Sequence, residues 1–265
     1  MKTTEMNELE KILVMGDIHG EFVDDRALDL TINYVRRVYK PDTIILNGDI
    51  VDFYGISRFD KDPLRKDNLQ YELDITKKLL TDLRKYFPTA KIYYLKGNHE
   101  ERLKANLSKN PEFSGLTALK LENLLDFRSN KINYVKATSN YWKKNPGHLM
   151  IGDVVIMHGD NRLNGAKGGK YASINTMINI NHNTVINHTH KLGVNYYSNS
   201  YVNLFAINSG CLCQIAGMAD FHQGFSTFEI NNGKACNPRT YRINDGVMIV
   251  DGKKFTTKKK IKNKI

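Results

Sequence analysis

The chain has 265 residues, of which 41% are hydrophobic and 25% are charged, and its formal net charge is +11. These values exclude a disordered or fibrous chain and fit one large globular domain. The last fourteen residues hold seven lysines and no acid, which leaves +4 for the remainder. We predict a domain over residues 1–250 and a basic, flexible tail over residues 251–265, either simply solvated or in contact with nucleic-acid phosphates.

The sequence gives no sign of a membrane segment or a structural zinc site. No apolar run reaches the ~20 residues of a membrane-spanning helix, and residues 1–11 lack the apolar core of a secretion signal. We therefore expect a cytoplasmic protein without membrane contact. Cys211, Cys213 and Cys236 cannot all pair and lack four-ligand spacing, so they are interpreted as reduced, incidental thiols.

The first third of the chain alternates between apolar runs and helical patterns. The runs at 10–16 (EKILVMG), 42–48 (DTIILNG) and 91–97 (KIYYLKG) predict buried strands. The spacing of apolar residues predicts helices over 27–39 and 69–87. Strands that alternate with helices favour a sheet with parallel character, in which ligands gather at the carboxyl ends of the strands.

The rest of the chain predicts short helices and then mostly strands. Residues 99–109, 116–127 and 172–180 have helical patterns. Apolar runs predict strands at 132–137, 148–153, 153–159, 184–187, 192–197, 201–208, 224–230 and 246–250. No repeat or linker divides the chain, so these elements are expected to form a single α/β domain.

Five of the apolar runs end in Asp, His or Asn, which are residue types that commonly serve as metal ligands. GDIHG, GDIVD and GNHE follow the first three strands, a fourth run delivers His158, and a fifth delivers His188 and His190. Any one of these residues could cap a turn instead, but strands normally end in generic turn residues, so five such endings together indicate a site. Carboxylates, imidazoles and one amide oxygen suit two adjacent divalent ions such as manganese, iron or zinc.

The motifs GDIHG, GDIVD, GNHE, MHG and HTH together resemble those of the calcineurin-like metallophosphoesterase superfamily, over about residues 11–230. The resemblance implies a four-layer α/β/β/α sandwich, with two mixed β-sheets and a dinuclear metal site at the carboxyl ends of the strands. It implies that Asp17, His19 and His190 bind the first ion, that Asn98, His158 and His188 bind the second, and that Asp49 bridges them. Manganese is the first choice, with iron, zinc, nickel or magnesium as alternatives.

The resemblance also implies two catalytic residues. His99 resembles the general acid that protonates the leaving oxygen, and Asp52 matches the carboxylate that orients this histidine. Two cations lower the pKa of a bridging water, so hydroxide is available near neutral pH to attack phosphorus. A serine or cysteine nucleophile is not required, and the sequence has no nucleophile elbow of the form G-x-S-x-G.

The residues after the second motif bear on the substrate. Protein phosphatases of this superfamily have Arg-Gly there, whereas Asp52 is followed by Phe53 and Tyr54. The paired HTH ending is shared with the phosphodiesterase and nuclease branches. A phosphomonoester dianion gains most from an extra guanidinium, so we favour a phosphodiesterase. The alternatives are a phosphomonoesterase acting on proteins or nucleotides, a DNA or RNA nuclease, and a non-catalytic nucleic-acid-binding scaffold, which the intact motif residues argue against.

Other segments resemble phage-encoded and bacterial metallophosphoesterases, namely DFYGISRFDKDP, THKLGVNYY, NSGCLC and HQGF, so a phage protein acting in a host cytoplasm is one interpretation. In the first of these, Tyr54 and Arg58, with Phe59 and Lys61, are predicted to form a substrate wall through aromatic stacking and phosphate contacts, unless the loop packs on its own domain. Residues 141–144 (YWKK) are interpreted as a stacking platform or a rim. Residues 165–170 (GAKGGK) lack the spacing of a phosphate loop and predict a flexible segment over the site.

The turn before the two final histidines departs from the family pattern. The family usually has glycine where this chain has Asn187. Asparagine tolerates unusual backbone angles better than most residues, so we expect Asn187 to make the turn. It is not predicted to be a ligand, but its side chain would crowd one side of the site or alter its metal affinity.

Overall fold

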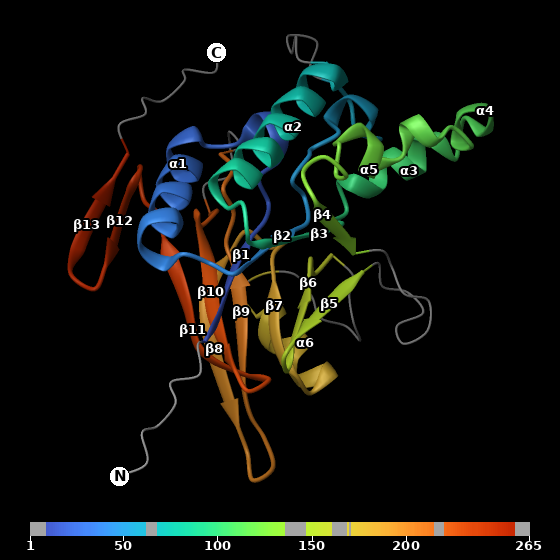
Figure 1. The fold of residues 1–265 in the computed structure, drawn as a ribbon. Helices are drawn as coiled ribbons and strands as arrows, with labels where there is room; N and C mark the ends of the chain where they lie inside the picture. Colours follow the sequence, from blue (N-terminus) through green and yellow to red (C-terminus); the bar gives the residue numbers. More distant parts are fainter. Residues whose placement is uncertain are drawn as a thin grey trace.

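The structure is a computed structural model that describes residues 9–61, 68–135, 147–160, 169, 171–214 and 220–257. Within these residues, two mixed β-sheets lie against each other and carry helices on their outer faces (Figure 1). Three predicted features lie wholly or largely outside the described residues. They are the segment 141–144, the segment 165–170 apart from Gly169, and the tail from residue 258 onward.

The first sheet has six strands in the order β11-β10-β1-β2-β3-β4. Their bounds are β1 Glu10–Met15, β2 Thr43–Asn47, β3 Lys91–Leu95, β4 Ile132–Val135, β10 Gly224–Asn231 and β11 Lys234–Arg242. Strands β1 to β4 pair in parallel, whereas β10 is antiparallel to both β1 and β11. The parallel pairing places the carboxyl ends of β1, β2 and β3, and the motifs that follow them, at one edge.

The second sheet has five strands in the order β5-β6-β7-β9-β8. Their bounds are β5 His148–Ile151, β6 Val154–Met157, β7 Asn183–Ile186, β8 Leu192–Ser198 and β9 Asn203–Ser209. The central strands β6, β7 and β9 are parallel, and the edge strands β5 and β8 are antiparallel to their neighbours. His158 follows β6 and His188 follows β7, so both histidines leave the sheet at the same end.

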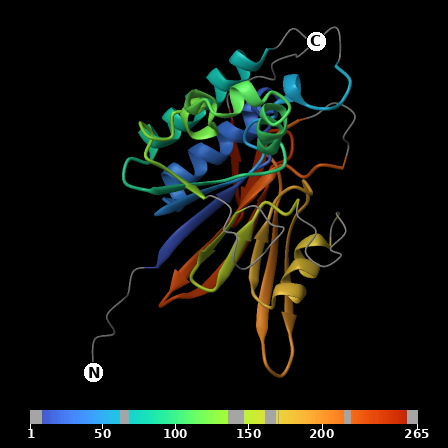
Figure 2. The same cartoon turned by 90° about the vertical axis from the view of Figure 1, so that its right-hand side faces the viewer.

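The longer helices cover the two outer faces. Helices α1 and α2 lie over the first sheet, and α6 lies on the second sheet (Figures 1 and 2). The helical bounds are α1 Asp25–Tyr34, η2 Val35–Tyr39, α2 Leu69–Tyr86, α3 Glu100–Leu107, α4 Pro111–Ser114, α5 Leu121–Leu124 and α6 Ala172–Ile180, with 3₁₀ turns η1 Gly20–Phe22, η3 Tyr54–Ile56 and η4 Thr117–Leu119. Among these described helices, none has the length and apolar character needed to cross a membrane.

The single helix predicted over residues 116–127 is wrong. The segment forms only η4 and the four-residue α5, with Lys120 in an extended conformation between them. Asp126 adopts a left-handed conformation with φ of 52°, which prevents the helix from continuing. The apolar spacing was helical, but the backbone is interrupted at both ends of α5.

Apolar packing between the layers follows the alternation of side chains along the strands. Ile12 and Val14 of β1 belong to the apolar cluster between the two sheets, together with Ile207 of β9. Leu13 and Met15, which point to the other face of β1, belong to the cluster beneath the helices of the first sheet. Burial of each such side chain contributes about 1.5–3 kcal/mol. A third cluster joins the second sheet to α6, so the predicted α/β/β/α fold is confirmed.

A hairpin extends beyond the predicted domain boundary at residue 250. Strands β12 (Val247–Val250) and β13 (Lys253–Thr256) pair antiparallel. Phe255 packs on the cluster beneath the helices, and Thr257 Oγ1 donates a hydrogen bond to Asp29 Oδ2 at 2.6 Å. The domain therefore extends beyond residue 250 and includes Lys253–Thr256, which were predicted to belong to the tail.

Candidate metal centre

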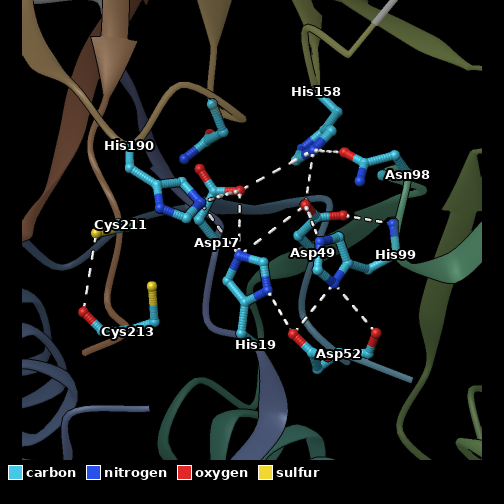
Figure 3. Close-up of polar contacts among 12 residues, drawn as sticks. Asp17, His19, Asp49, Asp52, Asn98, His99, His158, His190, Cys211 and Cys213 are labelled. Carbon is cyan, nitrogen blue, oxygen red and sulfur yellow. Dashed lines mark hydrogen bonds and ion pairs between the residues drawn. The ribbon is translucent and has the colours of Figure 1, made fainter. Parts of the chain in front are cut away.

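Side chains predicted as metal ligands lie together where the carboxyl ends of both sheets meet (Figure 3). Asp49 is central, because its Oδ2 lies 3.1 Å from His158 Nε2 and 4.0 Å from His19 Nε2. Two groups of ligand atoms share Asp49: one includes His19 and His99, and the other includes His158 and His188, with all atoms of a group within 4.8 Å of one another. This geometry fits two adjacent ion sites with one carboxylate between them.

The remaining three predicted ligands complete these two groups. His190 Nε2 lies 3.2 Å from His19 Nε2 and 3.7 Å from Asp17 Oδ1, on the side of the first ion. Asn98 Oδ1 lies 3.3 Å from His158 Nε2, on the side of the second ion. The structure thus brings together all seven residues predicted to bind metal. Asp17 Oδ1 lies 4.0 Å from both His19 Nε2 and His158 Nε2, so the division of the ligands between two ions stays a prediction.

The backbone at the site is held in a conformation that most residues avoid. The non-glycine residues with positive φ include Asp17 (49°), His19 (54°), Asp49 (51°), His188 (64°) and His190 (55°). A left-handed conformation costs roughly 1–2 kcal/mol for a residue with a side chain. Backbone hydrogen bonds maintain it; the amides of Ile18 and His19, for example, both donate to Asp49 O at 2.9 Å. Such strain is typical of functional sites.

The prediction that Asn187 makes the unusual turn is wrong, because the positive φ angles fall on His188 and His190 instead. Asn187 is buried and links the two sheets through its side chain. Its Oδ1 accepts a hydrogen bond from Asn47 Nδ2, and its Nδ2 donates to Gly210 O, both at 2.9 Å. Its amide lies beneath the site as a structural bridge.

Two glycines allow the motif loops to pack closely. A Cβ atom on Gly48 would lie 2.5 Å from His158 Nδ1, and one on Gly97 would overlap Asp49 Oδ1. Neither His158 nor Asp49 can move away without leaving the cluster. The glycines of GDIVD and GNHE are therefore required for close approach of the ligands.

Hydrogen bonds behind the imidazoles orient their other nitrogens toward the cluster. His158 Nδ1 lies 2.9 Å from the carbonyl oxygen of Asn47, which can only accept, so this nitrogen carries the proton. His19 Nδ1 lies 3.1 Å from Asp52 Oδ2. Each arrangement leaves the Nε2 lone pair of a neutral ring facing the cluster, as a metal ligand requires.

His99 lies beside these groups and contacts Asp52, as predicted. His99 Nδ1 lies 3.1 Å from Asp52 Oδ2, and His99 Nε2 lies 3.7 Å from Asp49 Oδ2. Asp52 therefore contacts both His99 and the candidate ligand His19. Burial opposes ionisation of Asp52, but hydrogen bonds with these two histidines hold its pKa below the usual range.

Arg102 is part of the site but was not identified from the sequence. Its Nη1 donates to Asp52 Oδ1 at 3.0 Å and to Asp52 O at 2.7 Å, and its Nη2 lies 3.1 Å from His99 Nε2. Arg102 comes three residues after His99, at the start of α3, so both side chains lie on one helix face. The three-residue spacing from His99 was the sequence feature that could have identified Arg102.

Two buried glutamates hold the loop after β2 and were also missed. Glu100 accepts hydrogen bonds from the amides of Asp49 (3.0 Å), Ile50 (2.9 Å) and Gly97 (2.8 Å), and from Tyr94 Oη (2.7 Å). Glu72 of α2 accepts from the amides of Asp52 and Phe53. Glu100 follows GNH directly and could have been suspected, whereas Glu72 has no local signal.

Comparison with known proteins places this chain in a family. Residues 10–208 match the sequence model of the calcineurin-like phosphoesterase family. The chain belongs to the calcineurin-like phosphoesterase family. This match supports the resemblance seen in the motifs. A comparison with curated proteins found no match.

Solved structures with a similar arrangement include Vps29 proteins and a bacterial protein. Wild-type Vps29 from Entamoeba histolytica, solved with Zn²⁺, is 15% identical, with 92% of this chain and 95% of that chain covered and a TM-score of 0.42. Vacuolar Protein Sorting 29 from Cryptosporidium parvum is 13% identical, with 95% and 100% covered and a TM-score of 0.45. TT1561 of Thermus thermophilus is 9% identical, with 88% and 98% covered and a TM-score of 0.41.

The donor set fits the divalent ions that this family uses. Asp17 is fully buried, yet neither of its carboxylate oxygens reaches a hydrogen-bond partner among the described residues, and burial raises its pKa to about 7. Burial lowers the pKa of His188 to about 4 and that of His190 to about 3, so both rings are neutral at pH 7 with lone pairs available. A cation would stabilise the carboxylate and use these lone pairs.

The electrostatics of the cluster also favour positive charge. Burial alone would lower the pKa of His158, but Asp49 and Asp17 raise it well above its usual value. Burial likewise opposes ionisation of Asp49, but His158 and His99 hold its pKa below the usual range. In this family of metal-dependent hydrolases, divalent ions would take the place of the protons that these groups attract.

Tyr54 and Arg58 remain predictions as substrate contacts. Tyr54 Oη donates to Asp60 O at 3.3 Å, and Lys61 Nζ lies 5.0 Å from the centre of the Tyr54 ring. The Arg58 guanidinium lies 5.3 Å from the Phe59 ring centre. These contacts are within the loop itself, which agrees with the alternative that the loop packs locally.

Proposed function

We propose that the protein is a metal-dependent phosphodiesterase in which His99 is the general acid. The observation that supports this most is the position of His99 beside the shared carboxylate, with Nε2 3.7 Å from Asp49 Oδ2. Two divalent ions, with manganese as the first choice, would lower the pKa of a water molecule and neutralise negative charge on the phosphoryl group. The seven candidate ligands would position the ester between these ions and His99.

His99 is anchored on one side and faces the cluster on the other. Its amide donates to Asp49 Oδ1 at 2.9 Å, and its Nδ1 is held by Asp52. The proton for the leaving oxygen would therefore come from Nε2. Arg102 Nη2 lies 3.1 Å from this nitrogen and can only donate to its lone pair, so the guanidinium would have to turn from Nε2 toward the leaving oxygen before Nε2 carries the proton.

The preference for diesters rests on how this guanidinium is used. Asp52 is followed directly by Phe53 and Tyr54, not by an arginine that could clamp a terminal phosphate, and Arg102 is already engaged by Asp52 and His99. A diester carries less charge and needs less compensation than a monoester dianion. Phosphomonoester hydrolysis is the second candidate, because Arg102 does place a guanidinium at the site. Nucleotides or nucleic acids as substrates, and the likeness to phage-encoded enzymes, rest on the sequence segments alone.

The substrate class is tested with a pair of chromogenic esters. With Mn²⁺, we expect kcat/KM for bis-p-nitrophenyl phosphate to exceed that for p-nitrophenyl phosphate by about tenfold, or about 1.4 kcal/mol. The two esters share a leaving group, so the comparison isolates the charge and the second substituent. The reverse preference would contradict the diester proposal and support the monoester alternative. Cyclic nucleotides and single- and double-stranded nucleic acids then identify the natural class.

The role of His99 is tested by changing it to alanine. We expect His99→Ala to lower kcat for an alkyl diester by about 10²–10³-fold, because an alkoxide leaves poorly without a proton. The same variant should lose much less activity on bis-p-nitrophenyl phosphate, since p-nitrophenolate needs little protonation. His182→Ala makes the same change at an exposed site and serves as the control. Full activity of His99→Ala on the alkyl diester would refute the assignment.

A further inference from the structure

A thiol lies beside the ligands of the first ion. The sulfur of Cys213 and the ligand nitrogens of His19 and His190 all lie within 4.8 Å of one another, and all three residues are buried. Figure 3 shows the Cys213 sulfur on the side that faces His190 and His19. The position is fixed by the backbone, because Leu212 N donates to Asp17 O at 3.1 Å and Cys213 forms a bridge with Val23.

The groups around this thiol have the spacing of ligands on one ion. Two zinc–nitrogen bonds of about 2.0–2.1 Å at a tetrahedral angle separate the nitrogens by roughly 3.3 Å. The Nε2 atoms of His19 and His190 are 3.2 Å apart. Asp17, 3.7 Å from His190 Nε2, is fully buried, and both of its oxygens lack a hydrogen-bond partner within the described part of the chain. The unpartnered carboxylate is independent evidence that a cation belongs here.

Cys211, two residues earlier, has a different environment. Its sulfur lies 3.9 Å from Cys213 O and 3.7 Å from His222 O, so the thiol is directed at backbone carbonyls. The first of these contacts is drawn in Figure 3. The two cysteines are both buried and their side chains contact each other, so Cys211→Ser is a control that changes a neighbouring thiol and leaves the Cys213 sulfur in place.

We propose that Cys213 binds the first ion as a thiolate, alongside Asp17, His19 and His190. On binding, the thiol releases its proton to solvent and the sulfur donates an electron pair to the ion, with no change of oxidation state. A thiolate favours Zn²⁺, Co²⁺ or Fe²⁺ over Mn²⁺ and Mg²⁺. The second site has Asn98, His158 and His188, and among the described residues no thiol lies near it. The two sites would therefore hold two different metals.

This inference rests on the proposed metal centre and predicts a spectroscopic signature. Metal-free protein, kept reduced with a phosphine, is titrated with Co²⁺. Wild-type protein should develop a near-ultraviolet thiolate-to-cobalt charge-transfer band together with visible cobalt bands. Cys213→Ser and Cys213→Ala should lose the charge-transfer band and keep the visible bands, and Cys211→Ser should keep both. Zn²⁺ affinity should fall by about 10- to 100-fold in Cys213→Ser, with less than about threefold change for Mn²⁺.

The outcomes separate this inference from the proposed function. Visible cobalt bands without a charge-transfer band in wild-type protein would refute the thiolate ligand and leave the metal centre intact. A charge-transfer band that survives in Cys213→Ser would refute it as well. Absence of any cobalt binding would refute the metal centre and, with it, the thiolate. If the variants do not fold, X-ray absorption of the zinc-loaded wild type decides, since a Zn–S distance of about 2.3 Å is expected.

Discussion

Asp49→Asn is expected to lower kcat/KM by at least about 10³-fold, or about 4 kcal/mol, and to prevent binding of a metal pair. Asp49 Oδ2 lies 3.1 Å from His158 Nε2, 4.0 Å from His19 Nε2 and 3.7 Å from His99 Nε2. Its carboxylate therefore faces both candidate ion sites and the proposed acid. Asparagine keeps the shape and one oxygen but removes the charge that would hold two cations close together.

The measurement combines metal analysis after dialysis with steady-state kinetics. Asp82→Asn makes the same change on the outer part of α2, where Asp82 pairs only with Lys78 among the described contacts, and should behave as wild type. Thermal unfolding of Asp49→Asn checks that the loop after β2 is intact, since Glu100 still accepts from its amides. A variant that kept both ions and activity within tenfold of wild type would show that Asp49 does not bridge the pair.

The ligand positions could be predicted from the sequence because each follows an apolar strand directly. The unbroken apolar run of β1 identifies it as a buried strand, and Asp17 and His19 follow directly at its carboxyl end. The neighbouring strands do the same, and parallel pairing then brings their ends together. Local sequence was sufficient wherever the functional residue and its supporting element are adjacent in the chain.

The residues that support the ligands depend on tertiary packing and could not be predicted in this way. Glu72 reaches the amide of Asp52 only because α2 packs beside the loop after β2, twenty residues earlier in the chain. Asn187 bridges the sheets only because Asn47 of β2 lies opposite. Strand β11 was missed for a similar reason, since its sequence KACNPRTYR has no apolar run and its pairing with β10 defines it.

The position of Asp17 predicts a change in stability whose sign depends on metal. Without metal, Asp17→Asn is expected to raise the free energy of unfolding by about 2 kcal/mol at pH 8, because a buried carboxylate without hydrogen-bond partners is replaced by a neutral amide. Burial raises the pKa of Asp17 from 3.8 to about 7. The unfolded chain therefore ionises this group at lower pH than the folded protein does, and the cost to the wild type grows as pH rises from about 4 to about 7.

Urea unfolding at pH 5 and pH 8, with and without metal, tests this directly. At pH 5 the gain from Asp17→Asn should be smaller than at pH 8, since Asp17 is then protonated in the folded state. With metal at about 100 times its Kd the wild type should gain about 2.7 kcal/mol, whereas the variant, lacking a charged ligand for the first ion, should gain much less. The order of stability would then reverse between metal-free and metal-loaded protein. A metal-free variant less stable than wild type at pH 8 would instead show that the surrounding histidines already compensate the Asp17 charge.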